Sequence, residues 1–137
     1  MTDQVLAFAP GRVELLGNHT DYNEGLVLAA AIHLGVTVRA SKAPPGELRI
    51  TSSAMSGKRT VSITQKVPVR EDSWINYPLG VISTLHQQGF TVPGAELEIA
   101  SDLPVGAGLS SSAALEVATA LALAHLFGFS LAGMDLA

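Results

Sequence analysis

The sequence predicts a single α+β domain in which helices pack on a mixed β-sheet. Apolar, β-branched segments come first, followed by one helical pattern, one alternating strand and a longer helical pattern. This order of elements is typical of α+β folds. Hydrophobic residues make up 47% and charged residues 15% of the 137 residues, which is enough to build one buried core. Neither an internal repeat nor a linker divides the sequence.

The first segment predicts two short strands and a polar loop. Residues 5–9 form an apolar run, and Pro10-Gly11 directly after it predicts a turn. We expect a second short strand over residues 12–16. Residues 17–25 read Gly-Asn-His-Thr-Asp-Tyr-Asn-Glu-Gly, which indicates a loop rich in hydrogen-bonding side chains.

Two further strands and a turn are expected next. Residues 26–32 and 36–40 are apolar and β-branched, so they predict strands, with a break near Gly35. Pro44-Pro45-Gly46 predicts a turn.

A hairpin follows this turn. Its strands are expected at residues 48–52 and 60–64, with Ser56-Gly57-Lys58 in the connection. Both strands alternate between apolar and polar residues, which predicts that one side of the hairpin faces solvent.

The first helix is expected between residues 73 and 88. Asp72 or Ser73 can cap its N-terminus, and Pro78 falls near the first turn, where proline does least harm. Gly89 follows Gln88 and is a typical signal for the end of a helix.

The last part of the sequence predicts a strand and a long helix. Residues 95–100 alternate between apolar and acidic side chains, as in a half-buried strand. A helix is expected from about Ser111 to Phe127, with Gly128 at its end. Ser130 has the character of a cap for another helix.

Composition excludes several classes of function. The net charge of −4 offers no basic surface for nucleic acid or anionic membrane. The absence of cysteine excludes disulfides, zinc-thiolate sites and cysteine nucleophiles. The four histidines, at positions 19, 33, 86 and 125, lack metal-ligand spacing. No secretory signal and no membrane span is visible, so we expect a cytoplasmic protein.

The segment from Pro104 to Ala114 has the pattern of a phosphate-binding loop. Glycines allow the main chain to turn its N–H groups toward a ligand, and the following helix contributes unpaired donors and the positive end of its dipole. Serine hydroxyls can donate to phosphate oxygens or coordinate a metal ion. A serine N-cap on a buried helix is the alternative, although a cap needs only one serine. The candidate residues are Pro104, Gly106, Ala107, Gly108, Leu109, Ser110, Ser111 and Ser112.

This segment differs from the two common phosphate loops. A P-loop requires Gly-Lys-Ser or Gly-Lys-Thr, whereas Gly57-Lys58 is followed by Arg59. The dinucleotide fingerprint requires a third glycine, where this sequence has Ser111.

The polar loop over residues 17–25 suits a hexose. Asp21 can accept hydrogen bonds from two hydroxyl groups through one carboxylate, and His19 and Asn18 can contact further hydroxyls. An ordinary Asn/Asp/Gly turn is the alternative.

Two motifs and one shorter segment resemble the GHMP kinases. Residues 9–25 are similar to the galactokinase signature, and residues 104–114 to the family's second motif, which wraps the triphosphate of ATP. Residues 73–77 resemble a tryptophan and an Asn-Tyr pair near the nucleotide, which assigns Trp74 to the nucleotide site. The resemblance implies a ribosomal protein S5 domain 2-like mixed sheet, with residues 1–137 as the N-terminal domain.

The resemblance also implies an activity. It is transfer of the γ-phosphoryl group of ATP to the C1 hydroxyl of galactose, with Mg²⁺ and with Ser112 as a metal ligand. Asn18, His19, Thr20 and Asp21 would bind the sugar. Arg12 corresponds to the active-site arginine between sugar and γ-phosphate, where a guanidinium stabilises developing charge. An ion pair between Arg12 and Glu14 is the alternative.

The sequence departs from the galactokinase pattern in two ways. Asn18 stands where galactokinases usually carry glutamate, which weakens the expected contact with the sugar's C6 group. The catalytic aspartate, the acidic Mg²⁺ ligand and the C-terminal domain of the family would all lie beyond residue 137, so we expect an incomplete enzyme that is inactive alone. Glu116 could approach the metal ion, but a structural role is the simpler expectation.

Two alternative functions remain open at this point. One is a galactokinase-like sensor that binds sugar and ATP without turnover. The other is a kinase for a related sugar such as N-acetylgalactosamine or arabinose, which the substitution at Asn18 would allow.

Overall fold

The structure, a computed structural model, describes residues 4–16, 28–53, 55–64, 73–103 and 111–131. Within these ranges, five strands, two α-helices and one 3-10 turn follow one another along the chain. They are β1 (Gln4–Leu16), β2 (Leu28–Lys42), β3 (Glu47–Ser52), β4 (Met55–Ser62), η2 (Ser73–Ile75), α1 (Asn76–Gln87), β5 (Ala95–Ser101) and α2 (Ser111–Phe127).

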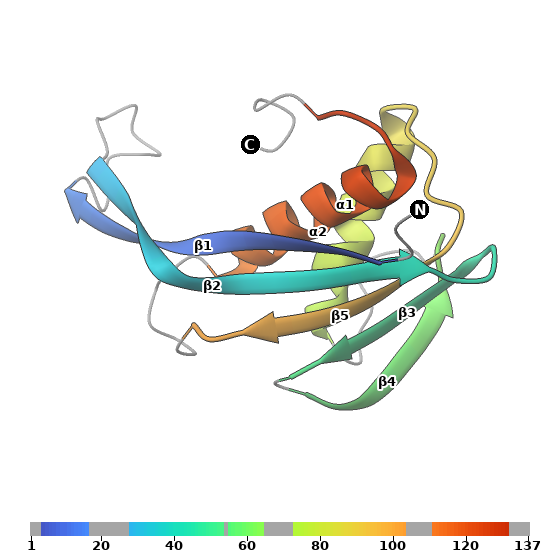
Figure 1. Ribbon diagram of the computed structural model, residues 1–137, viewed down its shortest axis with the longest axis horizontal. Coiled ribbons are helices and arrows are strands. Elements are labelled where there is room, and N and C mark those ends of the chain that lie inside the picture. The colour runs from blue at the N-terminus through green and yellow to red at the C-terminus, as the bar shows by residue number, and fades with distance from the viewer. Residues whose placement is uncertain (1–3, 17–27, 54, 65–72, 104–110, 132–137) are drawn as a thin grey trace.

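The strands form one mixed sheet in the order β1-β2-β5-β3-β4. The pairs β1–β2, β2–β5 and β3–β4 are antiparallel, and β3 and β5 run parallel. Both helices lie on the same face of the sheet, and β1 and β2 project together beyond the other strands (Figure 1). The predicted α+β fold with helices packed on a mixed sheet is confirmed.

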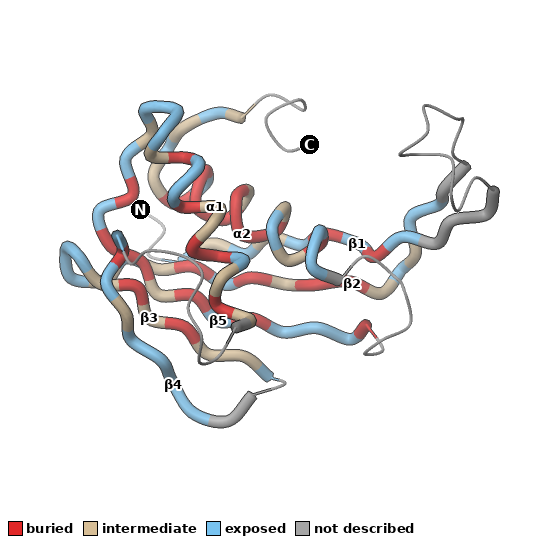
Figure 2. The backbone as a smooth tube through the Cα atoms, turned by 180° about the vertical axis from the view of Figure 1, so that it is seen from behind, coloured by how far each residue is buried: buried red, intermediate tan, exposed pale blue. Residues whose placement is uncertain are grey.

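The core lies between the sheet and the two helices (Figure 2). Its fully buried side chains include Leu48 and Ile50 of β3, Leu97 of β5, Ile82 of α1 and Leu123 of α2. The alternation in β5 follows the prediction: Leu97 and Ile99 are buried, whereas Glu98 is exposed. Period-two strands therefore direct one apolar face toward the helices.

Strand β1 corrects the prediction of two strands separated by a turn. The chain continues through Pro10-Gly11 as one strand, with a shift in register between Pro10 and Arg12. Within the described sheet β1 is an edge strand that pairs with β2 alone. Proline has no main-chain N–H to donate, and an edge strand tolerates this because it has no second neighbouring strand to bind. A register irregularity accommodates the two residues, so no turn is needed.

Strand β2 likewise runs through Gly35 without the predicted break. A Cβ atom added to Gly35 would clash with the carbonyl oxygen of Ala9 and would lie 2.6 Å from the Phe8 ring. This glycine allows β1 to approach β2 closely and does not interrupt the strand.

The hairpin prediction is correct in kind but wrong in its boundaries. Strands β3 and β4 pair from Glu47↔Ser62 to Ser52↔Met55, so Gly57 and Lys58 lie within β4 and not in the connection. Gly57 has a φ of 82°, which glycine adopts without strain, and it lies between Met55 and Lys58, where the register of the β3–β4 pair shifts as in a β-bulge. The predicted turn at residues 44–46 is confirmed, with Gly46 at a φ of 88°.

Both predicted helices are present. The first begins with a 3-10 turn at Ser73, and the N-cap of α1 is Ile75, which makes no side-chain cap hydrogen bond. The two residues expected to cap this helical segment are not tested, because Asp72 and the side chain of Ser73 lie outside the described part of the chain. Gly89 ends α1 at a φ of 92°, and Gly128 ends α2 at 75°. Ser130 lies outside any helix of the described chain, and the residues after 131 lie outside the described ranges.

Candidate functional site

The N-terminus of α2 is an exposed end of a long helix. The helix has 17 residues, with no acidic residue in its first turn. Ser112 and Ala113 are exposed, whereas Ala114, Ala118 and Ala122 are buried. Small buried side chains let α2 pack closely on the sheet, and a helix N-terminus presents main-chain N–H groups and the positive end of the helix dipole.

Arg12 lies beside this end of α2. A hollow of about 210 Å³ is lined by Ala9, Pro10 and Arg12 from β1 and by Ala113, Ala114 and Val117 from α2. Except for the exposed Arg12, its lining is apolar. The fold thus brings together the strand that precedes the predicted sugar loop and the helix that follows the predicted phosphate loop.

Trp74 lies in η2, at the entrance to α1. Its ring is half-buried and packs against the core, and its buried indole Nε1 has no hydrogen-bond partner in the part of the chain that the structure describes. A buried donor without an acceptor costs about 1–3 kcal/mol, so this N–H has an unused capacity for hydrogen bonding.

The remaining predicted site residues lie outside the described ranges. Residues 17–27, which include Asn18, His19, Thr20 and Asp21, follow the end of β1 at Leu16 and precede β2 at Leu28. Residues 104–110 lie between β5 and α2, and the side chain of Ser111 is likewise not described. Glu116 is exposed on α2.

The described residues contain no group of three or more His, Cys, Asp or Glu side chains placed to hold a metal ion. Near the N-terminus of α2, the described side chains that carry oxygen atoms include the Ser112 hydroxyl and, further along the helix, the exposed carboxylate of Glu116. Nor is any helix in the described part of the chain both long and apolar enough for a membrane span.

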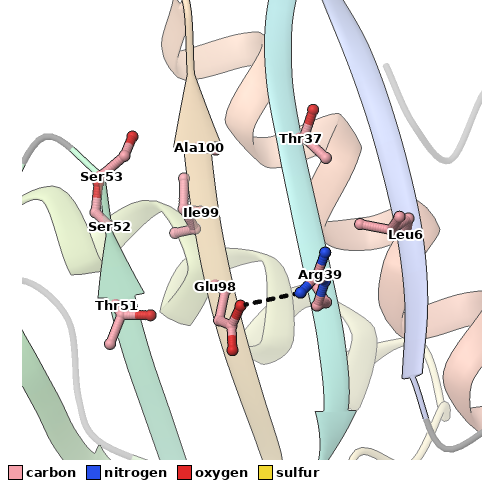
Figure 3. Close-up of a pocket in the computed structure, with 9 residues that line it drawn as sticks. All are labelled: Leu6, Thr37, Arg39, Thr51, Ser52, Ser53, Glu98, Ile99 and Ala100. Carbon is pink, nitrogen blue, oxygen red and sulfur yellow. Dashed lines mark ion pairs between the residues drawn. The ribbon is translucent and has the colours of Figure 1, made fainter.

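Sequence reasoning missed a groove on the sheet face opposite the helices. Its volume is about 400 Å³, and its lining comes from the four strands β1, β2, β3 and β5 and from Ser53, directly after β3 (Figure 3). Arg39 and Glu98 form an ion pair across β2 and β5 with a nitrogen–oxygen distance of 3.7 Å. Alternation identifies the outward residues, but only the strand order reveals which of them become neighbours.

A second feature that the sequence did not indicate is the contact between Asp102 and Gly35. The main-chain N–H of Gly35 donates to Oδ1 of Asp102 at 2.7 Å, and the N–H of Asp102 donates to the carbonyl oxygen of Gly35 at 3.2 Å. The two residues are 67 positions apart in sequence.

Two family models match separate parts of the chain. The galactokinase galactose-binding signature matches residues 2–42, and the N-terminal domain of GHMP kinases matches residues 76–137. The hollow beside Arg12 is lined by residues from both matched segments.

Similarity to galactokinases extends over nearly the whole chain. A galactokinase from Streptomyces coelicolor is 42% identical over 130 residues, which cover 94% of this chain and 34% of the relative. A crystal structure of Lactococcus lactis galactokinase complexed with galactose has a TM-score of 0.88 and 32% identity, and covers 98% of this chain and 36% of that one. Mevalonate kinase from Methanococcus jannaschii shares the fold, with a TM-score of 0.84 at 19% identity. The chain spans about a third of the length of the galactokinases that it matches.

Proposed function

Because the chain belongs to the GHMP kinase family and its relatives over nearly its whole length are galactokinases, we propose that residues 1–137 are the N-terminal domain of a sugar kinase. The reaction is transfer of the γ-phosphoryl group of ATP to the C1 hydroxyl of galactose. The observation that carries this proposal is the hollow beside Arg12, where the galactose-signature segment and the GHMP segment meet.

Arg12 acts on the transferred phosphoryl group. In phosphoryl transfer the protein contributes mainly positioning and electrostatic stabilisation. A guanidinium remains charged at any physiological pH and can hold two oxygens at once. At the rim of an apolar hollow it faces charge that develops between sugar and phosphate, and it favours ionisation of the attacking hydroxyl.

The end of α2 binds the phosphates of ATP together with residues 104–112. The exposed helix terminus without acidic residues in its first turn suits an anion. The glycines before it let the main chain approach the phosphates closely. Ser112 would coordinate Mg²⁺, which neutralises phosphate charge when bound, and the acidic part of the metal site comes from residues outside this chain.

Trp74 contributes to the nucleotide site. Its buried indole N–H has no acceptor among the described residues, and a bound nucleotide carries acceptors of the kind it requires. The half-buried ring also offers a face on which a base can stack. These two properties fit a nucleotide better than a purely structural tryptophan.

The sugar is bound by Asn18, His19, Thr20 and Asp21. These residues follow β1 in the sequence, a few positions after Arg12, and Asp21 supplies a carboxylate for two hydroxyl groups. The galactose complex of the Lactococcus lactis galactokinase, at 32% identity, supports galactose as the sugar. Asn18 is the residue that favours a related sugar, because an amide contacts the C6 group more weakly than a carboxylate.

The activity belongs to the longer protein. The catalytic aspartate, the acidic metal ligand and a C-terminal domain that covers the site are expected outside residues 1–137, in the two thirds of the relatives that this chain does not match. The C-terminal domain is then the intramolecular partner of this one, and the whole protein acts in the cytoplasm.

One assay tests this proposal. The full-length protein is incubated with ATP, Mg²⁺ and galactose, N-acetylgalactosamine or arabinose, and ADP release is measured together with the sugar phosphate. Galactose 1-phosphate as the preferred product is the expected result. Preference for another sugar would identify a related kinase, and binding of galactose and ATP without turnover would identify a sensor.

A further inference from the structure

A side chain accepts one of the hydrogen bonds at the end of the β2–β5 ladder. The register ends at Val36↔Ser101; Gly35 precedes Val36 in β2, and Asp102 directly follows β5. The N–H of Asp102 still donates to the carbonyl oxygen of Gly35, but the N–H of Gly35 donates to Oδ1 of Asp102 at 2.7 Å. The carboxylate thus replaces a main-chain acceptor, and the chain can turn away from the sheet directly after β5.

Gly35 is held equally closely from the β1 side. Its Cα partner is Pro10, and the space that a Cβ would need is occupied by Ala9 and the Phe8 ring. The next paired residue on β1 after Pro10 is Arg12, opposite Ala31. A chain of direct contacts therefore leads from Asp102 through Gly35 to the part of β1 that precedes Arg12.

The residue after Asp102 is also fixed. Leu103 is 7% exposed and belongs to the core, and its N–H donates to the Ser101 hydroxyl at 3.2 Å. The end of β5 is thereby attached on one side to β2 and on the other to the core. In the sequence, the predicted phosphate segment begins at the very next residue, Pro104.

We propose that Asp102 is a positioning residue for phosphoryl transfer, which sets the start of the phosphate-binding segment relative to the strand that carries Arg12. The proposal rests on the kinase function proposed above. Oδ1 of Asp102 accepts a main-chain N–H, so the carboxylate acts through the backbone and not on the reacting atoms. This task requires an acceptor held at the position of Oδ1.

The test compares two conservative variants of the full-length protein, Asp102→Asn and Asp102→Glu. Asparagine keeps an acceptor at the position of Oδ1 but loses the charge, whereas glutamate keeps the charge but moves the acceptor by one methylene. Since small misplacements can cost up to about 100-fold in rate, we expect Asp102→Glu to raise KM for ATP by about tenfold and to lower kcat. KM for galactose should stay within about twofold, and Asp102→Asn should remain close to wild type.

Glu98→Ala is the matched control, because it removes an acidic side chain from the same strand on the sheet face away from the helices. All variants are assayed at a temperature at which circular dichroism shows them fully folded. The proposal is overturned if Asp102→Glu retains the wild-type KM for ATP, or if Asp102→Asn is the more damaging change, since charge would then matter more than position. A wild-type protein without sugar-kinase activity would refute the proposed function instead.

Discussion

At the scale of single residues, Arg12 is the one charged side chain among the described residues that line the hollow between β1 and α2. Three of the residues that line this hollow, Ala9, Ala113 and Ala114, have small side chains. Arg39 lies on the opposite face of the sheet, where it forms an ion pair with Glu98. The two arginines are therefore expected to contribute very differently to catalysis.

Arg12→Ala in the full-length protein should lower kcat by about 100-fold or more, because the variant loses a positive group that stabilises negative charge in the transition state. KM for galactose and ATP should change much less, because the contact is strongest in the transition state. Steady-state kinetics with both substrates measures this split. Arg39→Ala is the control and should leave kcat within about twofold. A normal kcat in Arg12→Ala would assign Arg12 a structural role.

Asn18→Glu tests which part of the sugar this residue contacts. If Asn18 faces the C6 group, the substitution should strengthen galactose binding by about 1 kcal/mol, the difference between neutral and charge-assisted hydrogen bonds. Titration calorimetry with galactose and with arabinose, which lacks the C6 hydroxyl, measures the effect. An equal change for both sugars would mean that Asn18 affects the packing of its loop and does not contact C6.

At the scale of elements, the sequence predicted the kinds of element better than their boundaries. The two helices and β5 were found because their periodicity and terminal glycines are local signals. Pro10-Gly11 and Gly35 were misread as interruptions because their effect depends on the neighbouring strand: Gly35 leaves room for Ala9 and Phe8. A single sequence does not contain this information.

The same limit applies to the candidate site. Its residue types and motifs could be found from the sequence, because glycines, serines and clustered polar side chains are local features. The meeting of Arg12 with Ala113 and Ala114, and the contact between Asp102 and Gly35, depend on strand order and register. Both follow from long-range pairing that no local pattern encodes.

A pair of glycine substitutions tests this explanation of β2. Gly35→Ala should lower the free energy of unfolding by about 1–3 kcal/mol, because the new methyl group meets β1. Gly80→Ala is the matched control in α1, where a Cβ has no atom within 4 Å, and it should raise stability by about 1 kcal/mol. Urea denaturation of the full-length variants measures both. Equal effects would contradict the close approach of β1 at Gly35.

At the scale of the whole molecule, the two faces of the sheet differ. One face carries α1, α2 and the core, and the hollow beside Arg12 lies at the end of α2 on that side. The other face carries the Arg39–Glu98 and Lys58–Glu96 pairs and the exposed Leu6 and Phe8. Sugar and nucleotide residues are thus expected on the helical side, near the projecting ends of β1 and β2.

The last prediction concerns which catalytic groups lie within residues 1–137 and which lie elsewhere in the full-length protein. Residues 1–137 hold Arg12 and the predicted sugar and phosphate segments, but the catalytic aspartate and the acidic metal ligand are expected in the two thirds of the relatives that this chain does not match. Without a base for the C1 hydroxyl and without a covering domain to exclude water, positioning alone is insufficient for transfer. Purified residues 1–137 should therefore release no ADP in the presence of galactose, whereas the full-length protein should turn over under the same conditions. Sustained galactose-dependent ADP release by residues 1–137 would mean that the catalytic groups lie within this chain.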